Sequence, residues 1–396
     1  MKKGYNLFQV SIIIVVTAVI SAITTGTIYS KSFASGDGVN YSLYAMDENI
    51  RNFLNVYSEL TDDYYEDVNK KGMIDSAING MLNYIDESYT TYLDENSASS
   101  LIEQLSGTYE GIGITVQNHE IISIMADSPA DKAGLLEGDV IVSINSEDVR
   151  EKSVNELVQL IKNNENYVLI GIERMDEYLE FQINITTLYV PSVQYNMIDD
   201  TNIGYIKMSV FSSHLTEETI AALNKLDQFG MEKLIIDLRN NTGGYLEQAY
   251  QTAQLFLKKG RLVYTLKDKD SSEKFYDLDN NNQDYPIVVL VNNATASASE
   301  ILAGALKDSY GATLVGTVTF GKGKVQHTYS LSNGGIVKYT SSRWLRPNGT
   351  CVDNIGITPD YIIENDYLYD NPDSENKILL EIVDNQKNKA IEILNT

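Results

Sequence analysis

Cysteine and histidine are scarce in this chain of 396 residues, and their scarcity excludes several kinds of site. The single cysteine, Cys351, cannot form an intramolecular disulfide bond and has no second thiol with which to build a structural zinc site. None of the three histidines, His119, His214 and His327, belongs to an HExxH pattern, so we do not expect a zinc hydrolase. We expect no metal ion and no other cofactor.

Basic residues are also in the minority, with 30 lysines and arginines against 55 aspartates and glutamates. The net charge of −25 would repel a polyanion, so a nucleic-acid partner is not expected. Hydrophobic residues nevertheless make up 43% of the chain, which is typical of a folded protein. A chain of this length exceeds what one hydrophobic core usually serves, and we expect two or three domains.

Residues 7–30 form a long uncharged stretch that follows Lys2 and Lys3. The stretch is long enough to cross a hydrocarbon core of about 30 Å, and the lysines favour an N-terminus in the cytoplasm. Small residues at Ser32 and Ala34 also allow cleavage of a signal peptide. We expect residues 1–34 to be a single-pass transmembrane helix that anchors the chain in the cell membrane, or a signal that is cleaved and leaves the protein secreted. In both cases the rest of the chain lies outside the cytoplasm.

The N-terminal region, residues 35–105, is expected to be helical. Apolar residues recur there at three- and four-residue spacing, as at Ile50 and Phe53 and again at Ile74 and Ile78. Stripes of this kind are packing faces of helices rather than ligand sites.

After Gly107 the hydrophobic period changes to two, which predicts a compact β-rich unit over residues 106–187. Short strands, a helical turn closed by glycine and one longer helix are expected at Gly111–Val116, Ile121–Ile124, Ser128–Leu135, Gly138–Asn145, Val154–Lys162 and Tyr167–Glu173.

The run SPADKAGLLEGDVIVSINSEDV in this unit resembles a PDZ domain of the type found in bacterial proteases. The resemblance implies a groove beside a sheet edge, in which the C-terminus of a partner adds as an extra strand. The partner's carboxylate would meet backbone N–H groups at Gly111, Ile112, Gly113 and Ile114. A domain that acts only as a spacer is the alternative, because Lys162–Tyr167 lacks the glycines that such proteases often carry at this position.

Strands and helices alternate beyond Pro191, which predicts an α/β domain over residues 188–366, with a mostly parallel sheet covered by helices. Strands are expected at Ile203–Met208, Leu234–Leu238, Ile287–Val291 and Thr313–Val315, and helices at Glu217–Gln228, Leu246–Leu257 and Ala298–Lys307. Residues 267–284 have the composition of a surface loop or hairpin. Within residues 367–396 we expect one amphipathic helix, Ile378–Leu394, which packs on the core or on a second subunit of a homodimer.

Ser297 lies where the strand Ile287–Val291 leads into the next helix. The first turn of a helix has unpaired backbone N–H groups and the positive end of the helix dipole. A serine hydroxyl at this point can attack a carbonyl carbon, and the N–H of Ala298 can bind the oxyanion that forms.

A second oxyanion donor is expected from Gly243 or Gly244, which follow the strand Leu234–Leu238 in the run DLRNNTGG. Glycines let a backbone approach a substrate closely and adopt dihedral angles that other residues avoid. The alternative is that both glycines only close a turn between a strand and a helix.

Lys322, in a turn flanked by glycines, is the candidate base for Ser297, because no histidine lies in a recognisable triad motif. A free lysine has a pKa of about 10.4, so the site must disfavour the ammonium form, as burial does. Gln326 can accept a hydrogen bond from the amine and orient its lone pair toward Ser297.

Four segments, DLRNNTGG, ATASASEILAGALKD, TFGKGKVQ and GITPD, resemble the motifs of the carboxyl-terminal processing proteases, the S41 family of serine endopeptidases. The resemblance implies a crotonase/ClpP-like α/β core with a Ser-Lys dyad. It makes Ser297 the nucleophile, Lys322 rather than Lys324 the base, and Gln326 the partner of that base. It also implies that Asp308 supports the site, although an exposed carboxylate at a helix end is an equally good interpretation.

The chain departs from the family pattern at two places. Ile85–Tyr89 replaces the common Leu-Asp-Pro-His-Ser, and Val318 stands where an acidic residue often precedes TFGKG. Neither departure touches the dyad, but both fall in loops whose contacts the resemblance does not predict.

We therefore expect a multidomain serine endopeptidase that cleaves extracytoplasmic proteins near their C-termini, with the PDZ groove docking the C-terminus of the substrate. Two other functions are open: a catalytically silent PDZ scaffold, and an acyl-CoA-handling enzyme on a related core. The intact motifs around Ser297 and Lys322 disfavour the scaffold. The membrane segment and the PDZ domain disfavour the acyl-CoA enzyme.

Overall fold

The computed structural model describes residues 47–164, 166–280, 283–369 and 379–396. The chain divides into two units, Met1–Met81 and Leu82–Thr396, and every described strand lies in the second. The predicted anchor or signal, residues 1–34, lies outside the described residues. Within the described ranges, no helix combines the length and the apolar composition that a membrane span requires.

Helices form most of the described N-terminal region, in line with the three- and four-residue spacing: α3 (Glu48–Asp63), α4 (Lys70–Ile85) and α5 (Glu95–Ser106). Aspartates cap two of them, since Asp47 accepts a hydrogen bond from the N–H of Asn49 and Asp94 accepts one from the N–H of Ser97. A short strand, β1 (Thr91–Leu93), lies between α4 and α5, and the helical spacing does not predict it.

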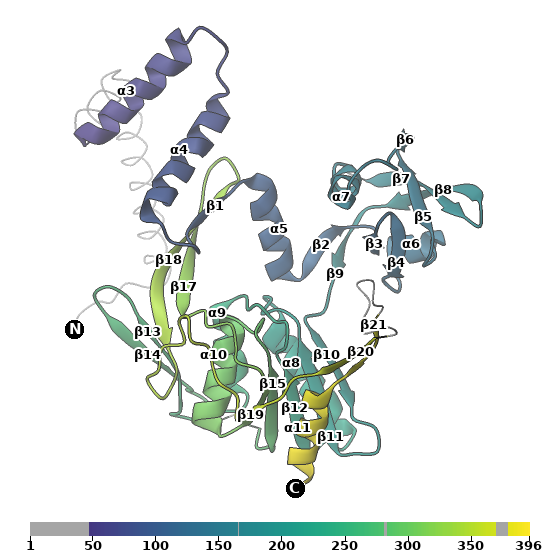
Figure 1. The fold of residues 1–396 in the computed structure, drawn as a ribbon, viewed down its shortest axis with the longest axis vertical. Helices are drawn as coiled ribbons and strands as arrows, with labels where there is room; N and C mark the ends of the chain where they lie inside the picture. The colour runs from purple at the N-terminus through teal and green to yellow at the C-terminus, as the bar shows by residue number, and fades with distance from the viewer. Residues whose placement is uncertain (1–46, 165, 281–282, 370–378) are drawn as a thin grey trace, which may run out of the picture. The chain divides into compact units, whose positions relative to one another are not determined.

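The PDZ-like unit is an antiparallel sheet in the order β3-β4-β5-β7-β8, with β6 beside β5 (Figure 1). Its elements are β3 (Ile114–Gln117), β4 (Glu120–Ile124), α6 (Pro129–Ala133), β5 (Val140–Ile144), β6 (Glu147–Asp148), α7 (Val154–Lys162), β7 (Tyr167–Arg174) and β8 (Glu177–Asn184). The core consists of buried aliphatic side chains, among them Ile121, Ile141 and Ile170. The chain enters through β2 (Thr108–Gly111) and leaves through β9 (Thr186–Tyr189), and these two strands pair with each other.

A second sheet of six strands has the order β10-β11-β12-β15-β16-β19. All of its pairs are parallel except β10 with β11, which confirms the expected α/β domain. Its strands are β10 (Val193–Met197), β11 (Ile203–Met208), β12 (Lys233–Asp237), β15 (Ile287–Val291), β16 (Thr313–Gly316) and β19 (Tyr361–Ile362).

Helices cover both faces of this sheet. Successive strand residues point to opposite faces. Ile236 and Val289 belong to the core cluster under α8 (Leu215–Gln228), α9 (Leu246–Gln254) and α10 (Ala298–Ala305). Ile235 and Val288 instead pack with Ala390 and Leu394 of α11 (Asn385–Asn395). The C-terminal helix is expected from the sequence to pack either on the core or on a second subunit. In the structure α11 packs on the sheet of its own chain.

Several helices differ in length from the sequence-based prediction. Helix α8 begins at Leu215 rather than Glu217, and α9 ends at Gln254 rather than Leu257. The C-terminal helix begins at Asn385 rather than Ile378, because β21 (Leu379–Val383) first pairs with β20 (Asp366–Tyr369). The helix after Ser297 ends at Ala305, and Leu306–Tyr310 continue it as a single π-helical turn, η1.

A third sheet joins distant parts of the chain in the order β1-β18-β13-β14, with β17 beside β18. Its later strands are β13 (Leu262–Lys267), β14 (Ser272–Tyr276), β17 (Lys324–Ser330) and β18 (Ile336–Leu345). The expected hairpin near residue 267 is the pair β13 and β14. Because Thr91 of β1 pairs with Lys338 of β18, residues that precede the PDZ-like unit are fixed beside residues that follow Lys322.

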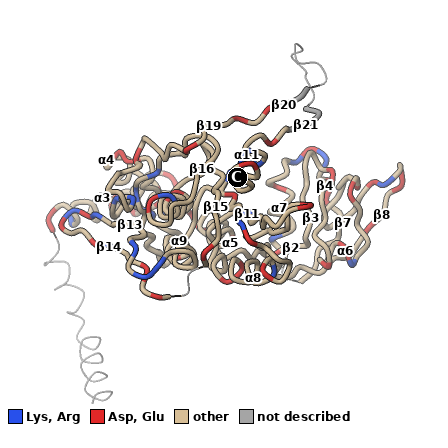
Figure 2. Tube along the Cα trace, turned by 90° about the horizontal axis from the view of Figure 1, so that it is seen from below, with Lys and Arg blue, Asp and Glu red and all other residues tan. Residues whose placement is uncertain are grey.

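Acidic residues are spread over both the helical and the strand-rich parts of the chain (Figure 2). One of them, Asp237, is buried in the sheet, with 2% of its surface exposed. Its carboxylate accepts hydrogen bonds from Tyr205 and Arg239, and the same arginine donates to Asp384 at the start of α11. Arg239 thus joins the end of β12 to the C-terminal helix.

Replacing Arg239 by methionine should lower the free energy of unfolding by about 3–5 kcal/mol, because it leaves the buried Asp237 carboxylate without its cation. Urea unfolding followed by tryptophan fluorescence measures the change. The control is Arg150→Met, which breaks ion pairs to two exposed carboxylates and should unfold close to the wild-type midpoint. Equal midpoints for both variants would contradict this prediction.

Candidate active site

Ser297 lies at a sharp turn between β15 and α10, at the N-cap of α10. Its φ is +58° and its ψ is −119°, a conformation that residues with a side chain rarely adopt. The preceding residue is fixed by a hydrogen bond from the N–H of Ala296 to the carbonyl of Asn241. The surrounding bonds thus hold Ser297 in a strained turn, with its side chain partly exposed.

Glu300 connects the turn at Ser297 to the turn that contains Lys322, hereafter the lysine turn. Its side chain is completely buried. One oxygen, Oε2, accepts hydrogen bonds from the backbone N–H groups of Ser297 at 3.0 Å and Lys322 at 2.8 Å. The other, Oε1, accepts from the Thr319 hydroxyl and the Gly321 N–H. Burial raises the pKa of Glu300, and these four bonds oppose that rise.

The other two hydroxyls of the serine motif are used in packing. Thr295 donates to the carbonyl of Leu238 at 2.8 Å, and Ser299 donates to the carbonyl of Asn241 at 2.9 Å; both side chains are buried. The hydroxyl of Ser297 makes no such bond to a carbonyl in the described parts of the chain. Of the three, Ser297 alone has both the exposure and the freedom that a nucleophile needs.

The two glycines proposed for the oxyanion hole differ in their hydrogen bonds. The N–H of Gly243 donates to the side-chain oxygen of Asn241. A Cβ on Gly243 would lie 2.9 Å from the Cβ of Ser297, so only glycine lets this loop pass the turn. Among the hydrogen bonds of the described residues, the N–H groups of Gly244 and Ala298 have no acceptor. These two are therefore the better candidates for oxyanion donors.

Lys322 sits in a tight turn whose glycines are required by packing. A Cβ on Gly321, where φ is +86°, would lie 2.7 Å from the N of Gly356. The carbonyl of Lys322 accepts a hydrogen bond from the buried Trp344 ring at 2.9 Å. Burial lowers the pKa of the Lys322 amine, and the positive charge of Lys338 lowers it further.

The side chains of Ser297 and Lys322 form no hydrogen bond with each other in the described structure. The Nζ of Lys322 instead lies 4.9 Å from the centre of the Tyr89 ring. The two turns are held together through their backbones by Glu300, and not by a bond between the two side chains.

Lys324, the other lysine of the motif, is in a different environment. Its Nζ lies 3.0 Å from a carboxylate oxygen of Glu87, and this hydrogen bond raises its pKa. Lys324 therefore keeps its proton to higher pH than Lys322 does, which favours Lys322 as the candidate base.

Gln326 and Asp308 lie outside the immediate contacts of the dyad. The amide of Gln326 donates to the carbonyl of Lys324 at 3.3 Å, and within the described residues it makes no hydrogen bond to the amine of Lys322. Asp308, in η1, forms a two-pronged ion pair with Arg346, and both side chains are 11% exposed. Asp308 thus connects η1 to the residue that follows β18 rather than extending freely into solvent.

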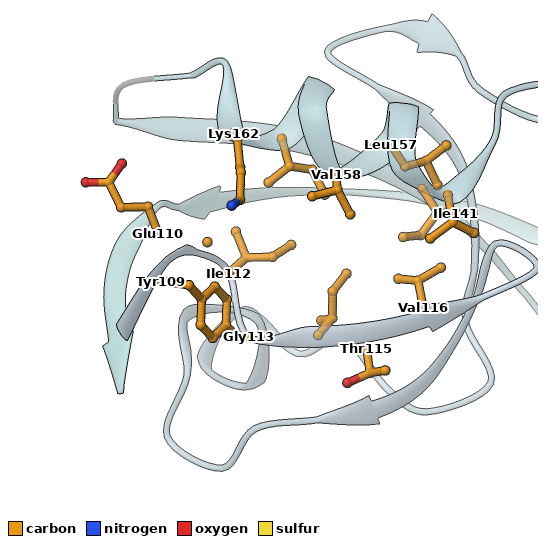
Figure 3. A pocket seen from close by; sticks show the side chains of 14 residues that line it. Tyr109, Glu110, Ile112, Gly113, Thr115, Val116, Ile141, Leu157, Val158 and Lys162 are labelled. Carbon is orange, nitrogen blue, oxygen red and sulfur yellow. The ribbon is translucent and has the colours of Figure 1, made fainter. Parts of the chain in front are cut away.

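A groove in the PDZ-like unit lies between β3 and α7 and encloses a cavity of about 240 Å³. Figure 3 shows Tyr109, Ile112 and Lys162 at one end and Val116, Ile141 and Leu157 at the other. The expected single strand Gly111–Val116 is broken here, because Gly113 has a φ of +91°. The N–H groups of Ile112 and Gly113 donate to no acceptor among the described residues.

Lys162 places a positive charge at the end of the groove where these N–H groups lie. Its amine pairs with Glu103 of α5 at 2.5 Å, and both side chains are about one-third exposed, at 29%. The sequence resemblance does not point to Lys162, and neither does it point to Glu300, Glu87 or Tyr89. The signal for Glu300 is its position three residues after Ser297, where a glutamate can accept from the N-cap backbone.

Comparisons with known proteins agree with this arrangement. Residues 202–363 match peptidase family S41, residues 120–174 match a PDZ domain, and residues 25–97 match the N-terminal domain of the activating protease CtpB. The chain is 34% identical over 366 residues to the carboxy-terminal processing protease CtpA of Bacillus subtilis (strain 168), covering 91% of this chain and 77% of that protein.

Two further similarities are of the same kind. A Staphylococcus aureus (strain MRSA252) protein named "Probable CtpA-like serine protease" is 34% identical over 360 residues, covering 89% of this chain and 72% of its own. The solved structure of a photosystem II D1 C-terminal processing protease is 26% identical, with a TM-score of 0.48, over 80% of this chain and 88% of its own. The described protein is thus a serine peptidase that carries a PDZ domain. It belongs to peptidase family S41, among the carboxyl-terminal processing proteases.

Replacing Glu300 by glutamine should lower both activity and stability, because the amide NH₂ would face backbone N–H donors. We expect a loss of about 1–3 kcal/mol in the free energy of unfolding, together with a fall in kcat at a temperature where the variant is still folded. Urea unfolding and cleavage of an unfolded protein substrate measure the two effects. Glu177→Gln, at the exposed first residue of β8, is the control. A folded Glu300→Gln protein with wild-type kcat would contradict the bridging role.

Proposed function

We propose that this peptidase uses Ser297 as nucleophile and Lys322 as general base to cleave extracytoplasmic proteins near their C-termini. The observation that carries the proposal is a difference within each motif. Lys322 differs from Lys324 in its surroundings, and the hydroxyl of Ser297 differs from those of Thr295 and Ser299. Among the described residues, neither the Ser297 hydroxyl nor the Lys322 amine donates a hydrogen bond, whereas Thr295, Ser299 and Lys324 each donate one. Of the two lysines, only Lys322 has a lowered pKa, and burial is its main cause.

In the proposed reaction the Oγ of Ser297 attacks the carbonyl carbon of the scissile peptide bond, and the amine of Lys322 takes the hydroxyl proton. The oxyanion accepts hydrogen bonds from the N–H groups of Gly244 and Ala298. Lys322 then returns the proton to the leaving amine, and the acyl group stays on Ser297. Water, activated by the same lysine, releases the acyl group and restores the serine.

Gln326 and Gly243 take supporting roles in this proposal. Gln326 lies on β17, two residues beyond Lys324, and its amide oxygen is proposed to accept a bond from the Lys322 amine when substrate is bound. Gly243 lets the oxyanion loop approach Ser297, since any larger residue would meet the serine Cβ. Asp308 keeps the end of α10 in place through Arg346.

The PDZ groove is proposed to dock the C-terminus of the substrate. Its apolar wall, formed by side chains such as Val158 and Leu157, suits an apolar terminal side chain, and the unpaired N–H groups of Ile112 and Gly113 suit a carboxylate. Lys162 adds a positive charge at that end. A substrate carboxylate would compete with Glu103 for this lysine.

For location we propose that residues 1–34 anchor the chain in the cell membrane with the peptidase outside the cytoplasm, or release it if the segment is cleaved. The uncharged stretch at residues 7–30 supports this. We also propose that two copies of the chain form a homodimer. Membership of family S41 favours the peptidase over a silent scaffold or an acyl-CoA enzyme.

Ser297→Ala and Lys322→Ala should each reduce cleavage of an unfolded protein substrate by at least about 10²-fold, because each removes a group that takes part in bond making. Mass spectrometry of the products also locates the cut. Ser100→Ala and Lys258→Ala, both at exposed positions, are the matched controls.

The pH profile of kcat gives a second test of the base. Because the pKa of Lys322 is lowered, kcat should rise with pH over a range that lies below the pKa of an ordinary lysine. Wild-type cleavage by either variant, or a limb near pH 6.5 that disappears in His327→Ala, would refute the dyad.

Val158→Arg, which places a long charged side chain in the PDZ groove, should raise KM for a substrate with an apolar C-terminus. Removing the last three residues of that substrate should raise KM for the wild-type enzyme and have no further effect on the variant. Met175→Arg, at an exposed turn of the same domain, is the control. If truncation leaves the kinetics of the wild-type enzyme unchanged, the domain is a spacer.

A further inference from the structure

The turn between α4 and β1, residues 86–90, contacts both lysines of the catalytic motif. The Tyr89 ring lies 4.9 Å from the Nζ of Lys322 and 5.5 Å from the Nζ of Lys324, measured to the ring centre. An ammonium group at this distance from an aromatic face is attracted by the ring quadrupole. The Tyr89 ring therefore contacts the amines of both lysines, of which only Lys322 is the proposed base.

Glu87, in the same turn, distinguishes between the two lysines. Its Oε1 binds the amine of Lys324 at 3.0 Å. Its Oε2 accepts from the hydroxyls of Thr340, on β18, and Thr90, at 2.7 Å and 2.9 Å. These bonds lower the pKa of Glu87 to about 2, against the effect of burial, so the carboxylate stays ionised in any assay near neutral pH.

Hydrogen bonds to β18 fix the position of the 86–90 turn. β1 pairs with β18 in register from Thr91 and Lys338 onward, and the N–H of Thr340 donates to the Thr90 hydroxyl at 3.2 Å. Glu87 and Tyr89 lie in the segment where this chain departs from the family pattern.

We propose that the 86–90 turn is a positioning element for the catalytic lysine, in which the face of the Tyr89 ring places the Lys322 amine and Glu87 holds Lys324 away as a permanently charged partner. The inference rests on the proposed function, since it assumes that Lys322 is the base. Tyr89 and Glu87 touch no substrate in this scheme. They act through the two lysines.

The charges around the Lys322 amine decide the sign of the expected effect. Lys338 on β18 disfavours its protonated form, while Glu300 on α10 and Glu87 in the turn favour it. The ring of Tyr89 also favours the protonated form, because the attraction exists only for a cation. Removing the ring should therefore lower the pKa of Lys322 and move the rising limb of the pH profile toward lower pH.

The test compares Tyr89→Leu with Tyr89→Phe in the full chain, with cleavage of an unfolded protein measured from pH 5 to pH 10. Tyr89→Leu should lower kcat by about tenfold or more with KM unchanged, because a displaced catalytic group is costly. It should also shift the rising limb down by about half a pH unit to one unit. Tyr89→Phe keeps the ring face and should match the wild type. Tyr84→Leu, at a position 92% exposed in α4, is the control.

The variant Glu87→Gln tests the positioning role of the turn independently. It removes a negative charge that favours protonated Lys322, so the rising limb should again move to lower pH. Thermal unfolding followed by circular dichroism checks that each variant is folded at the assay temperature. A wild-type kcat and pH profile in both Tyr89→Leu and Glu87→Gln would overturn the inference, as would equal impairment of Tyr89→Leu and Tyr89→Phe.

Lys322→Ala separates this inference from the proposed function. If Lys322→Ala is inactive while Tyr89→Leu behaves as wild type, the dyad stands and only the positioning role is lost. If Lys322→Ala is fully active, the proposed base is wrong and the positioning role falls with it.

Discussion

The carboxylate of Glu300 is the interaction on which the rest of the site depends. A carboxylate that is cut off from water is costly unless donors replace the lost hydration, and four donors from two turns do so here. To satisfy that one buried charge, the backbones of Ser297 and Lys322 must both approach it. In the described structure, the two turns are thereby kept together without a direct hydrogen bond between the side chains of Ser297 and Lys322.

A second constraint is electrostatic. Lys322 and Lys324 are chemically identical and lie two residues apart, so only their surroundings can give them different roles. Burial beside Lys338 acts on the first, and a carboxylate acts on the second. The turn that supplies the carboxylate comes from the segment before the PDZ domain. The difference in pKa between the two lysines is therefore set by tertiary structure rather than by the motif.

The sequence predicts the parallel sheet well, since Ile203–Met208 and Ile287–Val291 have the predicted bounds. Strands buried on both faces have continuous apolar runs, which makes them easy to find. The prediction fails where pairing is long-range: β1 is missed, and β21 replaces the start of the C-terminal helix. In the site, motifs point to Ser297 and Lys322, but the roles of Glu300, Glu87 and Tyr89 depend on contacts between segments that no local pattern encodes.

The pairing of β1 with β18 also has a consequence for biosynthesis. Thr91 leaves the ribosome long before its partner Lys338, and the PDZ domain, which has its own hydrophobic core, lies between them. Domains fold in order as the chain emerges, whereas contacts of high sequence separation must wait for their later partner. The lysine turn can be completed only when β18 has been synthesised. The nascent chain therefore carries a folded PDZ domain well before it carries an assembled peptidase domain.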